Sequence, residues 1–402
     1  MGPLIRRVVL RNYKSIAACD VGLAPLTLLV GPNGAGKSNF LDALRFVADA
    51  LTTTLEHALR DRGGIANVRR RSRGHPTHFG IALHLALRDG RSARYAFTVA
   101  AEKGGTFSVQ REDCEVSPSG ALGDNHFFHV EGGSVRGASE PIQSVIEPDR
   151  LALVTVSALP AFRPVYDALA GMGFYNLNPE HIRDLQDVDA GQKLARDGRN
   201  IAAVLREMAR AGGQAVLDRI SEELRAVVPG VVSVQPKTLG PKETLEFGQR
   251  VKGDENPWGF LAASMSDGTL RALGVLVAVH QASVNGARRV TLVGIEEPEA
   301  AIHPGAAEVL LETLRGASDD VQVLVTTHSP ELLDHPALTD AEIRAVDMVD
   351  GRTVVGEVDA ASRSALRDRL YTAGELLRQG QIKPSEEAYA CHPDQVRLFD
   401  GE

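Results

Sequence analysis

The residues best suited to chemistry form a glycine-rich run that begins at residue 31. It reads Gly-Pro-Asn-Gly-Ala-Gly-Lys-Ser and fits the pattern G-x-x-x-x-G-K-[ST]. Glycines let backbone N–H groups curl around phosphate oxygens, and a following helix adds its positive end. Lys37 would neutralise the β- and γ-phosphates, and the Ser38 hydroxyl would ligate Mg²⁺. The alternative is a glycine-rich turn whose lysine is merely exposed. We predict a site for a nucleoside triphosphate formed by Gly31, Pro32, Asn33, Gly34, Ala35, Gly36, Lys37, Ser38 and Asn39.

A second set of chemical groups follows the apolar run VTLVGI, which ends at residue 295. Glu296, Glu297 and Glu299 come directly after it, where the carboxyl end of a strand in an α/β sheet would place them near the glycine-rich loop. Adjacent acids can divide two tasks, so we predict Glu296 as a metal ligand and Glu297 as the general base that polarises water. The alternative is a solvated acidic loop.

Two further positions could contact phosphate. His328 ends the apolar run VQVLV-Thr-Thr, 31 residues after Glu297, which leaves room for one crossover helix between parallel strands. Its imidazole could hydrogen-bond a γ-phosphate, although a lone histidine is more often structural. Ser266 and Gly268 open an apolar helical segment; ordinary N-capping explains the serine, and the same geometry also builds an anion site.

The elements that must position these groups alternate between strand and helix patterns. Short apolar runs at 4–11 and 26–30 precede the loop, and the helical pattern FLDALRFVADAL follows it. Three alternating runs at 79–87, 93–101 and 106–116 predict an antiparallel meander. Helical spacing dominates residues 160–228, and strand and helix alternate again from 269 to 333. We therefore predict an α/β fold with a mixed or parallel sheet, an antiparallel β meander and an inserted helical lobe.

Taken in order, GPNGAGKS, SMSDGT, VGIEEPE and TTHS resemble the Walker A, signature, Walker B and switch-histidine motifs of ABC-type ATPases. The segment LRNYKS at 10–15 resembles the opening of the SMC, RecF and OLD branch of these P-loop NTPases, which acts on nucleic acid. The EEPE motif, its AIHP continuation and the stretch DGRNIAAVL at 197–205 resemble RecF/OLD-like predicted ATPases. The similarity extends from residue 4 to about 335.

The resemblance implies that two protomers pair head to tail around ATP and Mg²⁺. Ser266 and Gly268 of one protomer would bind the γ-phosphate held by the other. Three positions depart from the family pattern: Glu296 replaces an aspartate, Asp267 replaces a glycine, and the Q-loop is not placed, Gln143 being the candidate. A carboxylate that points at phosphate would repel it, so we expect Asp267 to turn away or to cap the helix.

The strand and helix patterns and the motifs together predict four segments. These are an ATPase lobe at 1–158 with Walker A and the meander, a helical lobe at 159–230, a second ATPase lobe at 231–345 with the signature, Walker B and switch histidine, and a strand, helix and tail at 346–402. Only 67 residues follow residue 335, too few for the Toprim nuclease module of OLD-like relatives. We interpret residues 364–384 as one helix with a docking segment, and residues 392–402 as loose.

Composition narrows the class of protein. Lys and Arg number 44 against 52 acidic residues, so the net charge of -8 excludes a wholly basic surface for nucleic acid. Arg69, Arg70, Arg71 and Arg73, with Arg60 and Arg62 nearby, form the only dense basic stretch and could grip DNA phosphates, or form a solvated loop. The three cysteines show no metal or disulfide spacing, and no run of about 20 apolar residues is present. We expect a reduced, cytoplasmic protein with no membrane span.

Together these patterns predict an ATP-hydrolysing, Mg²⁺-dependent switch that forms a homodimer, or a higher oligomer of dimers. The process would be DNA-linked, either antiviral defence or DNA repair, with an effector or nuclease supplied by a separate chain. The alternative is an ATP-gated scaffold that recruits an effector without turnover; a transporter subunit is a distant third.

Overall fold

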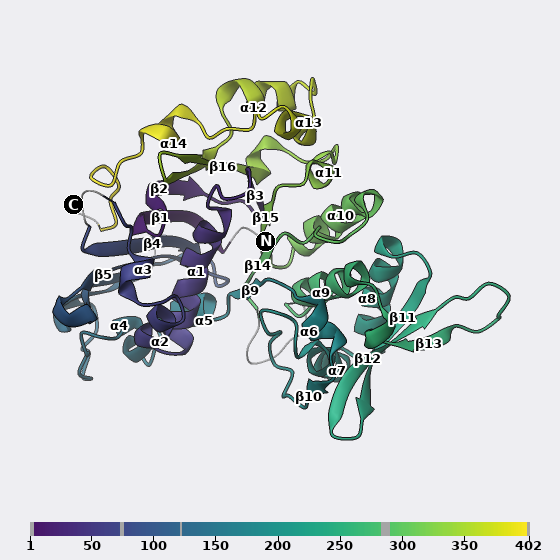
Figure 1. Cartoon of the computed structure of the whole chain (residues 1–402). Coiled ribbons are helices and arrows are strands. Elements are labelled where there is room, and N and C mark those ends of the chain that lie inside the picture. The colour runs from purple at the N-terminus through teal and green to yellow at the C-terminus, as the bar shows by residue number, and fades with distance from the viewer. Residues whose placement is uncertain (1–3, 73–75, 121–122, 283–289, 400–402) are drawn as a thin grey trace. The chain divides into compact units, whose positions relative to one another are not determined.

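The computed structural model describes residues 4–72, 76–120, 123–282 and 290–399, and the chain forms two compact units (Figure 1). Unit 1 consists mainly of residues 173–339 and 368–381. Unit 2 consists of residues 2–172, 340–367 and 382–402. The phosphate-loop sequence therefore belongs to unit 2, and the acidic and histidine motifs belong to unit 1. The four segments predicted from the sequence stay a prediction.

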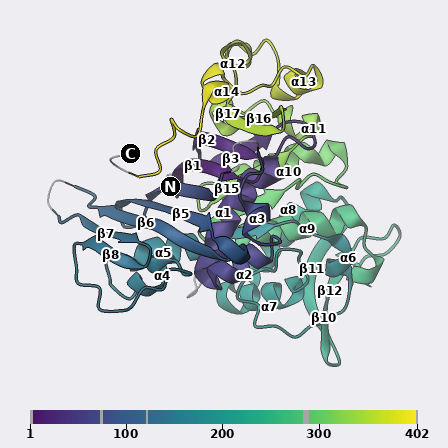
Figure 2. The same cartoon turned by 60° about the vertical axis from the view of Figure 1, so that its left-hand side comes forward.

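Unit 2 is built on a long, mostly antiparallel run of strands, which Figure 2 shows side by side from β5 to β8. Neighbours pair antiparallel except that β17 is parallel to β2 and β16 is parallel to β3. The predicted meander is confirmed as β4 to β6 and continues into two strands that we did not predict. In spatial order the strands are β8 (Ser134–Ala138), β7 (His126–Glu131), β6 (Phe107–Ser117), β5 (Ser92–Ala101), β4 (His78–Ala86), β1 (Ile5–Tyr13), β2 (Ile16–Gly22), β17 (Arg352–Glu357), β16 (Ile343–Val349) and β3 (Leu26–Val30).

Helix α1 (Lys37–Thr52) supplies much of the core of unit 2. Its apolar residues recur at three- and four-residue spacing, so one face is fully buried. The Phe46 ring meets Tyr13 and Phe79 edge-on at centroid distances of 6.1 and 5.4 Å. The remaining helices of unit 2 are α2 (Leu55–Arg60), α3 (Ile65–Val68), α4 (Ala152–Val156), α5 (Arg163–Ala170), α12 (Ala360–Arg367) and α14 (Glu386–Ala390).

The end of the chain corrects two predictions. Residues 364–384 do not form one helix, because α12 ends at Arg367 and α13 (Ala373–Arg378) starts separately after Arg369, whose φ is 55°. Residues 392–399 are not loose either. Val396, Leu398 and Phe399 are buried against Val9, Ala18, Ala82 and Ala96 of the sheet. This terminal strap, residues 396–399, is thus part of the core of unit 2.

Unit 1 combines a parallel sheet with helices and a small antiparallel sheet. The strands β9 (Gly173–Tyr175), β14 (Leu292–Glu296) and β15 (Gln322–Thr327) are parallel, and β15 is buried along its whole length. The second sheet has β12 (Lys242–Gln249) at its centre, and the loop from β12 to β13 projects from unit 1 (Figure 1). Its other strands are β10 (Gln186–Asp187), β11 (Val231–Leu239) and β13 (Trp258–Leu261).

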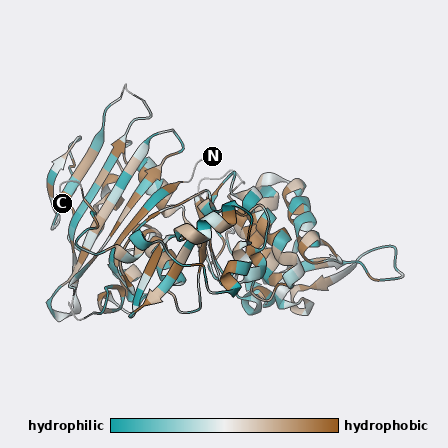
Figure 3. Ribbon diagram, turned by 90° about the horizontal axis from the view of Figure 1, so that it is seen from above, coloured by the Kyte–Doolittle hydropathy of each residue, from teal (hydrophilic) through white to brown (hydrophobic). Residues whose placement is uncertain are grey.

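The predicted helical region is only partly helical. Strands β9 and β10 interrupt it, and Gly213, with φ 70°, separates α7 (Ile201–Gly212) from α8 (Gln214–Val227). Helix α9 (Asp267–His280) is buried on almost every side, whereas the strands of the meander alternate between polar and apolar residues (Figure 3). No described helix is both long and apolar enough to cross a bilayer. The other helices of unit 1 are α6 (Pro179–Arg183), α10 (Ala307–Ala317) and α11 (Pro330–Leu333).

Candidate functional site

The glycine-rich loop joins β3 to α1 in unit 2, as the sequence predicted. Gly36 precedes the helix with φ 101°, and a Cβ there would lie 2.0 Å from the Thr353 hydroxyl oxygen, so only glycine fits. No side chain caps α1, and its first turn carries no acidic residue. The N-terminus of this 16-residue helix, with its positive dipole end, is therefore not occupied by a capping side chain or an acid, which suits an anion.

Lys37 lies over this loop. Its Nζ donates to the Gly31 carbonyl at 2.7 Å and to the Pro32 carbonyl at 3.0 Å, and the residue is only 6% exposed. Ser38 is exposed in the first turn of the helix. A buried ammonium beside an exposed hydroxyl at the start of a helix can bind a phosphate chain and its cation.

A chain of side-chain hydrogen bonds, mostly between hydroxyl groups, holds the glycine-rich loop in place. Asn39 Nδ2 donates to Ser15 Oγ at 2.7 Å, and Ser15 Oγ lies 2.7 Å from Thr353 Oγ1. Thr353 Oγ1 then donates to the Ala35 carbonyl at 2.9 Å. Thr353 was not predicted as part of the site, because it lies in β17 and is 318 residues from Ala35 in the sequence.

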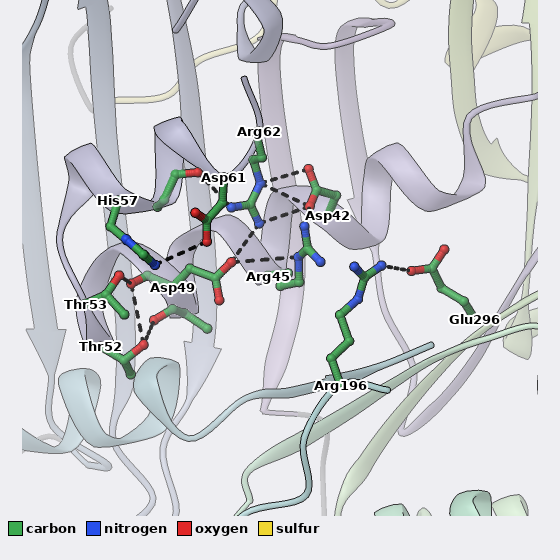
Figure 4. Close-up of polar contacts among 12 residues, drawn as sticks. Asp42, Arg45, Asp49, Thr52, Thr53, His57, Asp61, Arg62, Arg196 and Glu296 are labelled. Carbon is green, nitrogen blue, oxygen red and sulfur yellow. Dashed lines mark hydrogen bonds and ion pairs between the residues drawn. The ribbon is translucent and has the colours of Figure 1, made fainter. Parts of the chain in front are cut away.

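Asp42 anchors the same helix through buried charges (Figure 4). Its carboxylate contacts Arg62 Nε at 3.1 Å, Arg45 at 2.6 Å, Lys14 at 2.5 Å and the Tyr13 hydroxyl at 2.8 Å. Burial by itself would raise the pKa of Asp42, but the cations, Arg62 first, hold it well below its usual range. Arg62 is 2% exposed in its side chain, so this arginine serves the core rather than a DNA surface.

The acidic motif of unit 1 lies at the carboxyl edge of its parallel sheet. Glu296 is in register with Thr326, so the residues after β14 and β15 leave the sheet side by side. His328 Nδ1 lies 3.1 Å from Glu297 Oε1, and both side chains are about two-fifths exposed. Glu297 has φ 45°, a left-handed conformation that is costly for glutamate. The predicted base and the predicted switch histidine are therefore in direct contact.

Glu299 points inward from the same edge. Its Oε1 accepts a hydrogen bond from Thr327 Oγ1 at 2.5 Å, while its Oε2 is buried without a hydrogen-bond partner. Burial raises the pKa of Glu299 above its ordinary value. Arg271 of α9 is half-buried, and its Nε also lacks a partner. This buried donor and buried acceptor are polar groups that a ligand or water can satisfy.

Glu296 accepts a hydrogen bond from Arg196 at 2.7 Å (Figure 4). Sequence reasoning missed Arg196, which lies 100 residues earlier and follows no motif for a metal site.

The signature residues take structural roles that the sequence left open. Ser266 caps α9 by accepting from the Thr269 N–H at 3.2 Å. The Asp267 carboxylate forms an ion pair with the Arg183 guanidinium at 2.5 Å. Of the two expected arrangements, turning away or capping the helix, the side chain adopts the first.

Gly268 has a packing requirement of its own. A Cβ at this position would lie 2.4 Å from the Ala301 carbonyl oxygen, in the turn after Glu299. The start of α9 therefore packs closely on the acidic segment within unit 1. Ser266 and Gly268 belong to the same unit as Glu296, Glu297 and His328, whereas residues 31–39 belong to unit 2.

The basic stretch is engaged in the fold of unit 2. The Arg69 guanidinium donates to the Pro76 carbonyl at 2.7 Å, and that of Arg70 donates to the Ser15 carbonyl at 2.7 Å. Arg71 is exposed and pairs with Asn67. Arg73 lies outside the described residues. Gln143, the Q-loop candidate, is exposed in an irregular segment of unit 2.

Comparison with known proteins identifies the family. The family model "AAA domain, putative AbiEii toxin, Type IV TA system" matches residues 26–118 and 182–334, more than half of the chain. The chain belongs to this family of AAA ATPase domains. The OLD nuclease of Thermus scotoductus is 22% identical over 399 residues, which span 93% of this chain and 68% of the relative. The RecF replication and repair protein of Gloeobacter violaceus is 37% identical over 92 residues, 22% of this chain and 24% of that protein.

Solved structures agree on the fold. An Smc head bound to the C-terminal winged-helix domain of ScpA matches with a TM-score of 0.56 and 15% identity, over 90% of this chain and 100% of that one. A Pyrococcus furiosus Smc head with an extended coiled coil, bound to the C-terminal domain of ScpA, matches with a TM-score of 0.54 and 13% identity, over 92% and 100%. The predicted α/β fold of the ABC-ATPase type and the SMC, RecF and OLD resemblance are confirmed.

Proposed function

We propose that the protein binds and hydrolyses ATP, with the phosphates held by residues 31–39. The observation that supports this most directly is the loop between β3 and α1, in which a left-handed Gly36 leads into an uncapped helix beside buried Lys37. Backbone N–H groups and an ammonium at one helix start form a site for a polyphosphate chain.

The oxygen donors fit magnesium. Ser38 is the proposed Mg²⁺ ligand of unit 2, and Glu296 is the proposed metal ligand of unit 1. Mg²⁺ usually takes few protein ligands and keeps several waters, and it would supply charge neutralisation at the β- and γ-phosphates. No group of three His, Cys, Asp or Glu residues in the described part of the chain forms a closed metal cage. A hydroxyl and a carboxylate suit a hard cation that is shared with a phosphate ligand.

Glu297 and His328 would carry the proton chemistry. The Glu297 carboxylate accepts a proton from the attacking water as the new P–O bond forms, and ADP leaves as the γ-phosphoanhydride bond breaks. His328, which lies 3.1 Å from that carboxylate, would orient it and contact the γ-phosphate.

We further propose a head-to-tail homodimer in which Ser266 and Gly268 of one protomer face the ATP of the other. The support is the family resemblance and the exposed Ser266 at the start of α9. The role would be a cytoplasmic, DNA-linked switch in defence or repair, with an effector or nuclease in a separate chain, since the relatives include an OLD nuclease and RecF. DNA contact through Arg71 and its neighbours belongs to this proposal.

Calorimetry tests the proposal. Mg·ATP should bind the full chain, and Lys37→Ala should abolish binding; binding that is unaffected by this change would refute the site. Glu297→Gln should slow hydrolysis by about 10² to 10⁴ while ATP still binds, and should increase the dimer fraction in light scattering. If the biological activity needs turnover, the same variant loses it, whereas an ATP-gated scaffold keeps it.

A further inference from the structure

An open, polar pocket of about 490 Å³ lies in unit 1, a volume in the range of small-ligand sites. Three arginines line it, namely Arg196, Arg199 and Arg271. Asp197 is the only carboxylate among its described lining residues, and His181 lies 2.9 Å from it. The lining therefore carries an excess of positive charge.

The cations of the pocket are incompletely matched. Arg199 lies 3.8 Å from Asp197, a long contact for an ion pair, and its side chain is 74% exposed. The Nε of Arg271 is buried without a hydrogen-bond partner. A guanidinium with donors to spare favours an oxyanion such as phosphate, because two oxygens of one phosphate group can accept two parallel hydrogen bonds from it.

The pocket is preformed by backbone contacts. The Asn176 N–H donates to the Arg196 carbonyl at 2.9 Å, and the Asn178 N–H donates to the Asp197 carbonyl at 3.0 Å. Both asparagines follow β9, which is in register with β14. The turn that carries two of the arginines is thus fixed against the sheet edge that ends in Glu296, and little ordering remains to be lost on binding.

We propose that this pocket binds phosphate groups, and that Arg196 links it to the acidic edge by leaving Glu296 when an anion binds. The guanidinium of Arg196 lines the pocket and also donates to Glu296 at 2.7 Å, so the same cation faces both the pocket and the acidic edge. The phosphate can come from a free nucleotide or from a nucleic-acid strand. The link to Glu296 rests on the proposed function, but the phosphate site does not.

The shared arginine has a thermodynamic consequence. While Arg196 is hydrogen-bonded to Glu296, it competes with a metal cation for that carboxylate. A phosphate group that draws Arg196 into the pocket removes this competition. Phosphate in the pocket and Mg²⁺ at Glu296 should therefore favour one another.

The first experiment uses the full chain without Mg²⁺ or nucleotide. Inorganic pyrophosphate is titrated by calorimetry, and fluorescein-labelled single-stranded DNA is titrated by anisotropy at several salt concentrations. Arg199→Ala should weaken binding of at least one probe about 10-fold, as loss of a hydrogen bond to a charged group does. Arg210→Ala is the matched control, because Arg210 is 75% exposed and pairs with Glu207 at 2.6 Å; it should change nothing.

The two probes distinguish the possible sources of the phosphate group. Weakening with pyrophosphate alone identifies a free nucleotide or phosphate ligand, and weakening with DNA alone identifies a strand. Binding that Arg199→Ala leaves intact and Lys37→Ala removes belongs to the phosphate loop and overturns the proposal. Equal loss in the Arg199 and Arg210 variants, which would indicate diffuse charge, also overturns it.

A second experiment tests the link. The Mg²⁺ concentration for half-maximal binding of a fluorescent, non-hydrolysable ATP analogue is measured. Arg196→Ala should lower it several-fold, and Arg196→Lys should restore the wild-type value. An unchanged or higher requirement refutes the link. If the wild-type chain does not bind the analogue, the proposed function and the link both fail, while the first experiment still decides the phosphate site.

Discussion

The phosphate loop of unit 2 and the acidic edge of unit 1 are organised in opposite ways. The loop is fixed by its backbone and by buried charges such as Asp42, whose side chain is 9% exposed. The acidic edge presents Glu297 and His328, which are 40% and 43% exposed, on a residue with left-handed backbone. A loop that we propose to hold phosphate can thus be part of the core, whereas the side chains that we propose to accept protons and change partners stay accessible.

The largest expected effect is on the stability of unit 2. Asp42→Asn leaves Arg62, Arg45 and Lys14 without their shared carboxylate, and loss of one partner in a buried ion cluster costs about 3 to 5 kcal/mol. Urea denaturation measures the loss. Asp49→Asn is the control, since Asp49 pairs with the same Arg62 but is 39% exposed and should cost less than about 1 kcal/mol. Equal losses of stability in the two variants would contradict the view that buried charges fix the phosphate loop of unit 2.

A pH effect of intermediate size should come from Glu112 of the meander. Burial raises its pKa to about 7, although the Leu153 and Ala152 N–H groups and the Tyr95 hydroxyl favour the ionised form. Unfolded chains lose this proton near the ordinary value of 4.5, while folded chains keep it until about pH 7. The free energy of unfolding should therefore fall by up to about 3 kcal/mol between these pH values and level off above them. Glu112→Gln should flatten this slope; an unchanged slope would contradict the assignment.

The smallest effect should have the opposite sign and lie in unit 1. Glu297→Gly relieves a left-handed backbone at φ 45°, so the variant should be about 1 kcal/mol more stable, and on the proposed mechanism it should hydrolyse ATP about 10² to 10⁴ times more slowly. Glu297→Ala separates backbone from charge, because it removes the carboxylate but keeps the Cβ, and it should gain much less. Thermal unfolding of both variants measures the change in stability. Equal gains in the two variants would mean that the stabilisation comes from removing the charge of Glu297 and not from relieving its backbone.

The sequence predicted those parts of the site that are contiguous. Residues 31–39 and the pair Glu296 and Glu297 could be singled out because each motif directly follows its own strand, β3 or β14. Arg196 and Thr353 were missed because only the tertiary fold brings them to Glu296 and Ala35. Their residue types carry no signal of such distant contacts.

The fold was predicted with similar limits. The meander was clear because its runs alternate with period two. The short strand β9 was not predicted because three residues are too few to show a period. Strands β11 to β13 were not predicted because their polar and apolar residues are mixed on a half-exposed sheet. The terminal strap was misjudged because its few apolar residues lie in a polar stretch and find their partners only on the distant sheet.

That strap has a consequence for how the gene can be handled. Arg94 hydrogen-bonds the Leu398 carbonyl, and the Arg111 guanidinium lies 4.2 Å over the Phe399 ring, so residues 396–399 cover the sheet as a lid of its own chain. A stop codon introduced before residue 396 would expose an apolar β surface, the kind of surface that drives recombinant protein into inclusion bodies. Loss of residues 396–399 should therefore lower the yield of soluble protein.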